Sequence, residues 1–70
     1  MRKEELVKLG KVIREKRLSR NLTQLELSVR AEVDRNYIGM LERGDRNPSY
    51  LSLLKIAKGL ELPINELLTF

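Results

Sequence analysis

The 70-residue chain contains no cysteine and no histidine. Without cysteine it cannot form a disulfide, and without either residue it lacks the usual ligands of a zinc site. The most common general base and a common nucleophile are thereby absent, and the carboxylates are scattered along the chain rather than clustered. We therefore expect a protein that is not an enzyme and that has no metal, cofactor or small-molecule ligand.

Long apolar runs are also missing. No run exceeds two residues, although 41% of the residues are apolar, whereas a membrane-spanning helix needs roughly 20 predominantly apolar residues. No apolar signal core follows the charged residues 1–5, so the sequence predicts a cytoplasmic protein. We expect one domain, residues 1–70. Because no disulfide or metal stabilises so small a domain, we expect self-association to contribute to its stability.

The charge is basic and unevenly distributed. A net charge of +4 favours an anionic partner, with nucleic acid the first candidate. Residues 1–20 carry eight Lys or Arg against three Glu, whereas residues 21–48 carry four basic against five acidic residues. The basic N-terminal segment can meet phosphates, or it can simply be the solvated face of an amphipathic helix.

The first part of the chain predicts two helices. Apolar residues recur at spacings of three and four within residues 4–20, which indicates an amphipathic helix ending near Asn21. Thr23 and Glu26 match a capping box, in which the threonine oxygen and the glutamate carboxylate each accept a backbone N–H of the other residue. The second helix is short and ends at about Ala31.

A third helix follows after a brief turn. Asp34 is a favourable N-cap, and Gly44 can adopt the left-handed conformation that ends a helix. Residues 44–48 are Gly-Asp-Arg-Asn-Pro, in which every residue except the arginine is typical of turns. They predict a loop.

Two further helices complete the predicted fold. Ser49 caps a fourth helix, which ends within residues 59–62, and Pro63 suits the first turn of a final short helix. This fifth helix carries Ile64, Leu67 and Leu68. The predicted fold class is all-α, a compact five-helix bundle.

The second and third helices have the pattern of a helix-turn-helix from Gln24 to Arg43. Two helices that cross at about 90–120° approach closely only where the residue at the crossing is small. The interior positions of such a motif are Leu27, Ser28, Ala31, Val33, Ile38 and Leu41, all apolar or small. An ordinary helical hairpin does not require these spacings, so they favour the helix-turn-helix.

Residues 24–49, and more loosely the whole chain, resemble the phage-repressor-like (Cro/C1, XRE) helix-turn-helix family with its lambda-repressor-like domain. Residues 34–39 and 41–49 are most similar to the controller proteins of restriction–modification systems. The resemblance implies a sequence-specific DNA-binding transcriptional regulator that acts as a homodimer on a twofold-related operator. It also implies a structural salt bridge between Arg17 and Glu42. The alternative is an antitoxin-like or other protein-interaction module with the same fold.

The family places the N-terminal part of the third helix in the major groove. The matching base-reading positions here are Arg35, Asn36, Gly39 and Met40. An arginine can pair bidentately with guanine and an asparagine with adenine. Gly39 would let the backbone approach DNA closely. Met40 can contact a thymine methyl group, or it can be a partly exposed filler of the core.

Other residues are expected to contact the DNA backbone. The N-terminus of the second helix favours an anion because its N–H groups are free and its dipole end is positive. The expected phosphate contacts come from Gln24, Tyr37, Arg43, Arg46, Asn47 and either Arg14 or Arg17. Two alternatives stay open: Tyr37 can be a rim residue of the core, and any surface arginine can be solvated without a partner.

Two features depart from the family pattern. Glu32 occupies a turn position that usually holds glycine, which leaves the exact orientation of the third helix open. Leu25 and Val29 are apolar where the second helix is usually polar. They can pack against the N-terminal residues, meet a partner or simply be exposed.

The C-terminal apolar residues are the expected dimer interface. Related proteins bind as twofold dimers to half-sites about one helical turn, roughly 34 Å, apart. The candidate interface residues are Leu60, Leu62, Ile64, Leu67, Leu68 and Phe70. The alternative is that most of them cap the core of the single chain.

Overall fold

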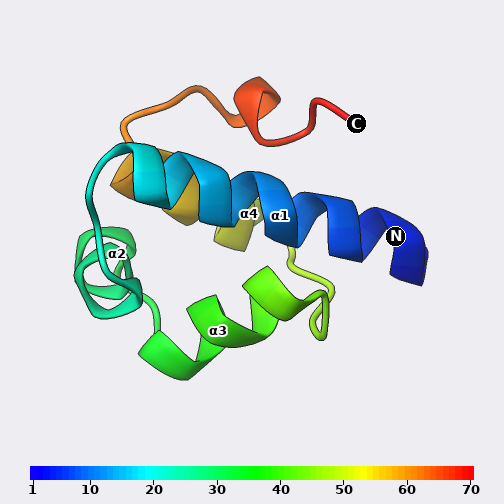
Figure 1. Ribbon diagram of the computed structural model, residues 1–70, viewed down its shortest axis with the longest axis horizontal. Coiled ribbons are helices and arrows are strands. Elements are labelled where there is room, and N and C mark those ends of the chain that lie inside the picture. The colour runs from blue at the N-terminus through cyan, green and yellow to red at the C-terminus, as the bar shows by residue number, and fades with distance from the viewer.

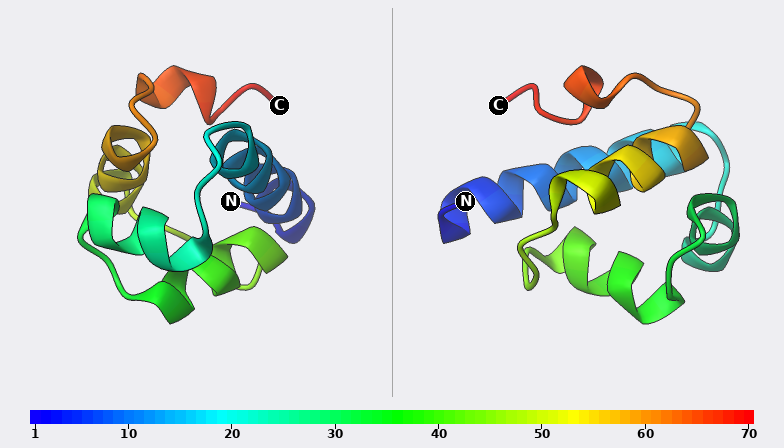
Figure 2. Two further views of the ribbon diagram at one scale, coloured as in Figure 1. Left: turned by 60° about the vertical axis from the view of Figure 1, so that its left-hand side comes forward. Right: turned by 180° about the vertical axis from the view of Figure 1, so that it is seen from behind.

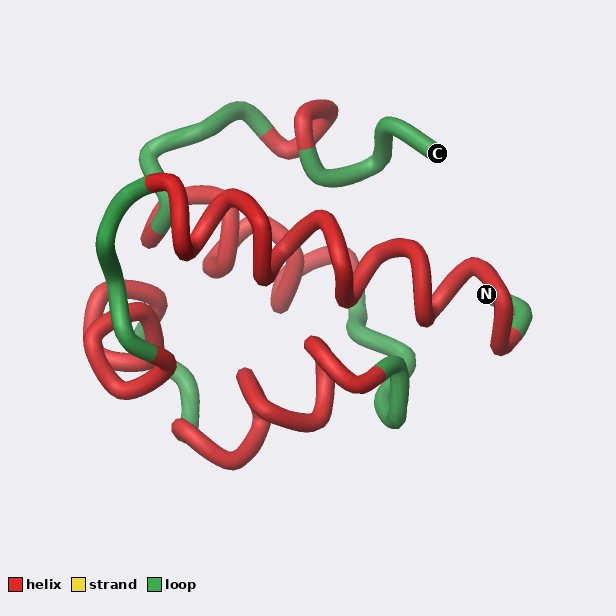
Figure 3. The backbone as a smooth tube through the Cα atoms, in the orientation of Figure 1, coloured by secondary structure: helices red, strands yellow, loops and turns green.

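Four α-helices make up the computed structural model, which describes all residues from 1 to 70 (Figure 1). In chain order they are α1 (Lys3–Ser19), α2 (Gln24–Ala31), α3 (Arg35–Arg43) and α4 (Tyr50–Gly59). Loops connect them and no strand is present, as the tube in Figure 3 shows. The prediction of an all-α fold is confirmed.

Side-chain caps set the starts of α2, α3 and α4 where the sequence predicted them. The backbone N–H of Glu26 donates to Oγ1 of Thr23 (3.0 Å), and the N–H of Thr23 donates to the carboxylate of Glu26 (2.8 Å). Asp34 accepts from the N–H of Asn36, and Ser49 caps α4. Each cap satisfies backbone donors that the helix itself leaves free.

All four helices end in the same left-handed turn. Asn21, Glu32, Gly44 and Glu61 have φ values of 57°, 57°, 78° and 58°. In each case the next backbone N–H donates back to a carbonyl five residues earlier, at 2.9–3.1 Å. This is the closure of a Schellman motif. Gly44 adopts it without strain and Asn21 is a residue that tolerates it, whereas the Cβ of Glu32 and of Glu61 makes the conformation costly.

The prediction of a fifth α-helix is wrong. The segment after α4 contains only a three-residue 3₁₀ turn, η1 (Ile64–Glu66). Pro63 caps this turn in an extended conformation, with φ −69° and ψ 149°, and its carbonyl accepts the N–H of Glu66 at 3.0 Å. So short a segment gains too little from its own hydrogen bonds to form a stable α-helix. Its path is set instead by Leu67, which is fully buried in the core.

One apolar core holds the helices together. It consists of Leu9, Ile13, Leu22, Leu27, Ala31, Ile38, Leu41, Leu53, Ile56, Ala57, Leu60 and Leu67. α1 packs on α3, and α2 packs on both α3 and α4. Gly10 permits the first of these contacts, because a Cβ there would lie only 2.6 Å from the backbone oxygen of Glu42.

The arrangement leaves α3 on one side of the molecule. In Figure 1, α2 is seen end-on while α3 runs across the view beneath α1, so the two helices of the motif cross at a steep angle. The C-terminal segment lies on the opposite side of α1 from α3, in all the views of Figures 1 and 2. No helix has the length and apolar character required to cross a membrane.

Candidate nucleic-acid interface

The N-terminal half of α3 presents two polar side chains to the outside. The cap at Asp34 fixes the start of the helix, and Ile38 and Leu41 bury its inner face. Arg35 and Asn36 are both exposed on the first turn, and neither side chain makes a hydrogen bond within the chain. Their donors and acceptors are therefore free to bind a ligand.

The other two expected base readers lie differently. Met40 is half-buried, which is compatible with both of the roles expected for it. Gly39 is buried, and a Cβ built on it would lie 3.2 Å from Nη1 of Arg43 and 3.5 Å from Oε1 of Gln24. These two side chains cover the glycine, so the backbone there offers no open surface, contrary to our expectation.

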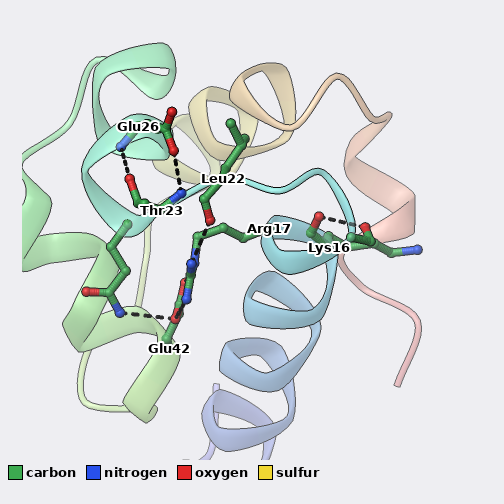
Figure 4. A network of polar contacts seen from close by, with 8 residues as sticks. Lys16, Arg17, Leu22, Thr23, Glu26 and Glu42 are labelled. Carbon is green, nitrogen blue, oxygen red and sulfur yellow. Dashed lines mark hydrogen bonds and ion pairs between the residues drawn. The ribbon is translucent and has the colours of Figure 1, made fainter.

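A buried ion pair links α1 to α3 (Figure 4). Nε of Arg17 donates to one carboxylate oxygen of Glu42 at 2.6 Å, and Nη2 donates to the other at 3.0 Å. Nη1 of Arg17 also donates to the carbonyl of Leu22 (2.7 Å). The side chains are only 9% and 3% exposed, so the salt bridge implied by the family resemblance is present. It also occupies Arg17, which leaves the exposed Arg14 as the phosphate candidate on α1.

The same carboxylate orients the first residue of α2. Nε2 of Gln24 donates to Oε1 of Glu42 at 3.1 Å. The capping box satisfies the N–H groups of Thr23 and Glu26, whereas the N–H groups of Gln24 and Leu25 have no partner within the chain. Free donors thus remain at the end of α2 that is expected to face DNA.

A second charged group surrounds the C-terminal end of α3. Asp45 accepts from Nε of Arg43 (3.2 Å) and from Nζ of Lys3 (3.1 Å), and Nζ of Lys3 also donates to the carbonyl of Gly44 (2.6 Å). The hydrogen bonds from Lys3 and then from Arg43 lower the pKa of the Asp45 carboxyl below its ordinary value. Asp45 is therefore ionised at neutral pH and holds two basic side chains.

Tyr37 and Arg46 contact each other beside α3. The ring of Tyr37 packs partly against the core, and the guanidinium of Arg46 lies 5.3 Å from its centroid, within the range of a cation–π contact. Tyr37 therefore packs at the rim of the core and contacts an arginine beside α3, and its expected phosphate contact stays a prediction. Arg46 and the neighbouring Asn47 are exposed in the loop after α3.

Glu32 adopts the left-handed conformation that its family position normally gives to glycine, with φ 57° and ψ 44°. The N–H of Val33 still donates to the carbonyl of Ser28 (3.0 Å), so the turn keeps its hydrogen-bonded closure. The turn therefore accommodates a left-handed glutamate and retains its form.

The structure corrects the expected dimer interface. Leu60 and Leu67 are fully buried within the single chain, so a partner cannot touch them. Leu62 and Ile64 are half-buried against the core, whereas Leu68 and Phe70 are exposed.

Three further exposed apolar residues lie on α4 and were not among the predicted interface residues. They are Tyr50, Leu51 and Leu54. Their spacing of one and three residues puts them on a shared helix face, away from the face of Leu53 and Ile56 that enters the core. A helical projection of residues 50–60 would have separated these two faces.

Leu25 and Val29 are two exposed apolar residues of α2. They are 54% and 69% exposed, one turn apart on the outer face of α2. Of the three alternatives for these residues, packing against the N-terminal segment is excluded by this exposure.

Known proteins show the same motif and the same arrangement of helices. Residues 13–67 match the model of a family described as helix-turn-helix. The chain is 39% identical over 62 residues to the control protein C.BamHI of Bacillus amyloliquefaciens, covering 87% of this chain and 76% of that protein. It is similar to the solved restriction–modification controller protein C.AhdI of Aeromonas hydrophila, with a TM-score of 0.90 and 41% identity over 91% of this chain and 97% of the other.

The fold is shared more widely as well. The clp gene regulator ClgR of C. glutamicum superposes with a TM-score of 0.85 at 26% identity, covering 91% of this chain and 83% of that structure. The family match spans most of the chain and includes the whole of α2 and α3. The chain therefore belongs to the Cro/C1-type (XRE) helix-turn-helix family, whose members are DNA-binding transcriptional regulators and not enzymes.

Proposed function

We propose that this chain is a controller of a restriction–modification operon that binds a twofold-related operator as a homodimer. The observation that carries the proposal is the free end of α3, where Arg35 and Asn36 are exposed with no partners inside the chain. These side chains suit guanine and adenine in the major groove. The similarity to C.BamHI and C.AhdI supports the controller role.

The dimensions of the protein support binding as a dimer. Its principal extents are 27 × 22 × 21 Å, whereas successive major grooves on one face of DNA are about 34 Å apart. One copy therefore reaches one half-site, and two adjacent copies reach two. Because the C-terminal segment lies opposite α3, a partner seated there leaves the base-reading end free (Figure 2).

The proposed dimer surface consists of the exposed apolar residues of α4 and of the C-terminus. These are Tyr50, Leu51, Leu54, Leu68 and Phe70. Sedimentation should return a dimer at micromolar concentration without DNA, and Leu51→Glu should return a monomer with an unchanged helical spectrum. Leu25→Glu is the matched control on α2 and should leave the dimer intact. A monomeric wild type at tens of micromolar would contradict the interface.

Footprinting on the DNA upstream of the gene tests the operator proposal. Two protected half-sites one helical turn apart are expected, with an affinity that falls steeply as salt rises because phosphate contacts release counterions. Equal binding to this site and to a scrambled duplex would contradict sequence-specific recognition.

A protein-interaction module is the second candidate, and the exposed Leu25 and Val29 favour it. Such a module would bind its partner with little dependence on salt, and Leu25→Glu would abolish that binding. If DNA binding is absent while a salt-insensitive protein complex forms, this function replaces the proposed one.

A further inference from the structure

Gly39 lies beneath two side chains that approach from different directions. Arg43 follows it by one turn of α3, and Gln24 begins α2. Nη1 of Arg43, Oε1 of Gln24 and Nε2 of Gln24 all lie within 4.0 Å of the point where a Cβ at Gly39 would be. The absence of a side chain at Gly39 thus leaves space over the helix for the guanidinium of one residue and the amide of the other.

Each of these two side chains is held by a carboxylate. Glu42 accepts from Nε2 of Gln24 at 3.1 Å, and Asp45 accepts from Nε of Arg43 at 3.2 Å. While Nε of Arg43 bonds Asp45, its Nη1 lies 3.2 Å from the Cβ position of Gly39. The amide of Gln24 has a second N–H, and the guanidinium of Arg43 has terminal N–H groups. None of these donors has an acceptor within the chain.

Both carboxylates are in turn neutralised from α1. Arg17 pairs with Glu42 through two nitrogens, and Lys3 contacts Asp45 at 3.1 Å. Two acidic side chains at a DNA-facing surface would otherwise repel phosphates. The basic character of α1 therefore has a use beyond direct phosphate binding, since it allows acidic residues to position the contacts without adding net negative charge.

We infer that Gly39 is a positioning residue, which lets Arg43 and Gln24 form a clamp for a single DNA phosphate. The inference rests on the proposed function and deepens it. The free N–H groups of Gln24 and Leu25 at the start of α2 provide further donors for the same anion. Gly39 itself touches neither a base nor a phosphate.

A double-mutant cycle tests the clamp on a duplex that the wild-type protein selects from a random library. Arg43→Ala should weaken binding to this site and to unrelated duplexes by roughly tenfold, the effect of one charge-assisted hydrogen bond, and should lower the salt slope by about one. Gly39→Ala should also weaken binding, by no more than Arg43→Ala does, because a Cβ 3.2 Å from Nη1 of Arg43 forces the guanidinium to shift. In the double variant the losses should not add, because both changes remove the same contact.

Arg46→Ala supplies the matched control, because Arg46 stacks on Tyr37 and lies outside the clamp. Its effect should add to that of Gly39→Ala. The fold should survive Gly39→Ala, since alanine has the higher helix propensity and the new Cβ meets only the ends of two flexible side chains. Its melting temperature should equal or exceed that of the wild type.

Arg43→Lys approaches the same question without altering the backbone of α3. Lysine keeps the charge but has no Nε–H to donate to Asp45, so several-fold weaker binding is expected. Full affinity in Arg43→Lys or in Gly39→Ala would overturn the clamp, as would additive losses for Gly39→Ala and Arg43→Ala. A wild type that selects no duplex would instead overturn the proposed function itself.

Discussion

The two ends of α3 differ in how their polar side chains are used. At the N-terminal end, Arg35 and Asn36 are exposed and have no partners within the chain. At the C-terminal end, Glu42 and Arg43 are engaged by residues of α1, α2 and the following loop. The anchored end fixes the position of the helix, and the side chains at the free end remain available to contact DNA bases. Stability and recognition should therefore be separable by mutation within a single nine-residue helix.

The largest effect should follow a change at the anchored end. Glu42→Ala leaves the guanidinium of Arg17 buried without its counter-charge, and breaking one partner of a buried pair costs about 3–5 kcal/mol. That is a large part of the roughly 5–15 kcal/mol by which small domains are stable. Chemical denaturation should show the loss as a lower midpoint.

A second pair of variants controls for this effect. Replacing both members of the pair, with Arg17→Met and Glu42→Leu, should recover much of the stability because no uncompensated charge is then buried. Asn36→Ala at the free end should change the free energy of unfolding by no more than about 0.5 kcal/mol. Equal losses at the two ends of α3 would contradict the division between them.

At the free end the effect should appear in recognition. Arg35→Ala should remove about 1–3 kcal/mol of discrimination at one base pair of the selected site and leave the melting temperature unchanged. Affinities for a panel of duplexes with single base-pair changes measure this. Arg46→Ala, by contrast, should weaken binding to all members of the panel similarly. A uniform loss for Arg35→Ala would mean that Arg35 contacts a phosphate.

Much of the fold could be predicted from the sequence, because the signals that begin and end the helices are local. Thr23, Asp34 and Ser49 cap the helices that they were expected to cap, and Gly44 ends α3. Each depends on residues no more than a few positions away, and the small residues at the helix crossing follow the same local spacing. The family resemblance supplied the long-range pair of Arg17 and Glu42.

What could not be predicted depends on distances between remote segments. Lys3 reaches Asp45 across 42 positions of sequence, and Gly39 is covered by a residue from another helix. No periodicity encodes either contact. Leu60 and Leu67 were assigned to an interface because they are apolar and C-terminal, but only the path of the last segment decides which leucines turn inward. The same path limits the fifth helix to a single 3₁₀ turn.

A smaller effect is expected at the turn that leads into the free end of α3. Glu32→Gly should stabilise the protein by about 1 kcal/mol, because glycine adopts the left-handed conformation without the clash of a Cβ. Glu32→Ala is the matched control and should give no such gain, since alanine keeps the Cβ. Thermal unfolding of the two variants compares them. Equal stability of the glycine and alanine variants would show that the turn stores no strain.

The smallest effect should be the dependence of stability on pH, which comes from exposed carboxylates at the start of α2 and just after α3. The backbone N–H of Thr23, and then its hydroxyl, lower the pKa of Glu26 below the ordinary value of 4.5, and Lys3 and Arg43 lower that of Asp45 below 3.8. A carboxyl with a lowered folded pKa contributes stability above its unfolded pKa and loses it as pH falls through the folded value. The free energy of unfolding should thus be level near neutral pH and decline below about pH 4.5.

Asp45→Asn and Glu26→Gln should each flatten this decline, and the pair should flatten it further than either alone. Asp45→Asn should at the same time leave the discrimination between base pairs unchanged, because Asp45 lies at the anchored end of α3. Urea unfolding between pH 3 and 7 measures the decline, and the duplex panel measures the discrimination. A change in base preference with Asp45→Asn would show that the two ends of α3 are coupled. Because this substitution should change stability little, it tests directly whether the C-terminal end of α3 influences base recognition at the N-terminal end.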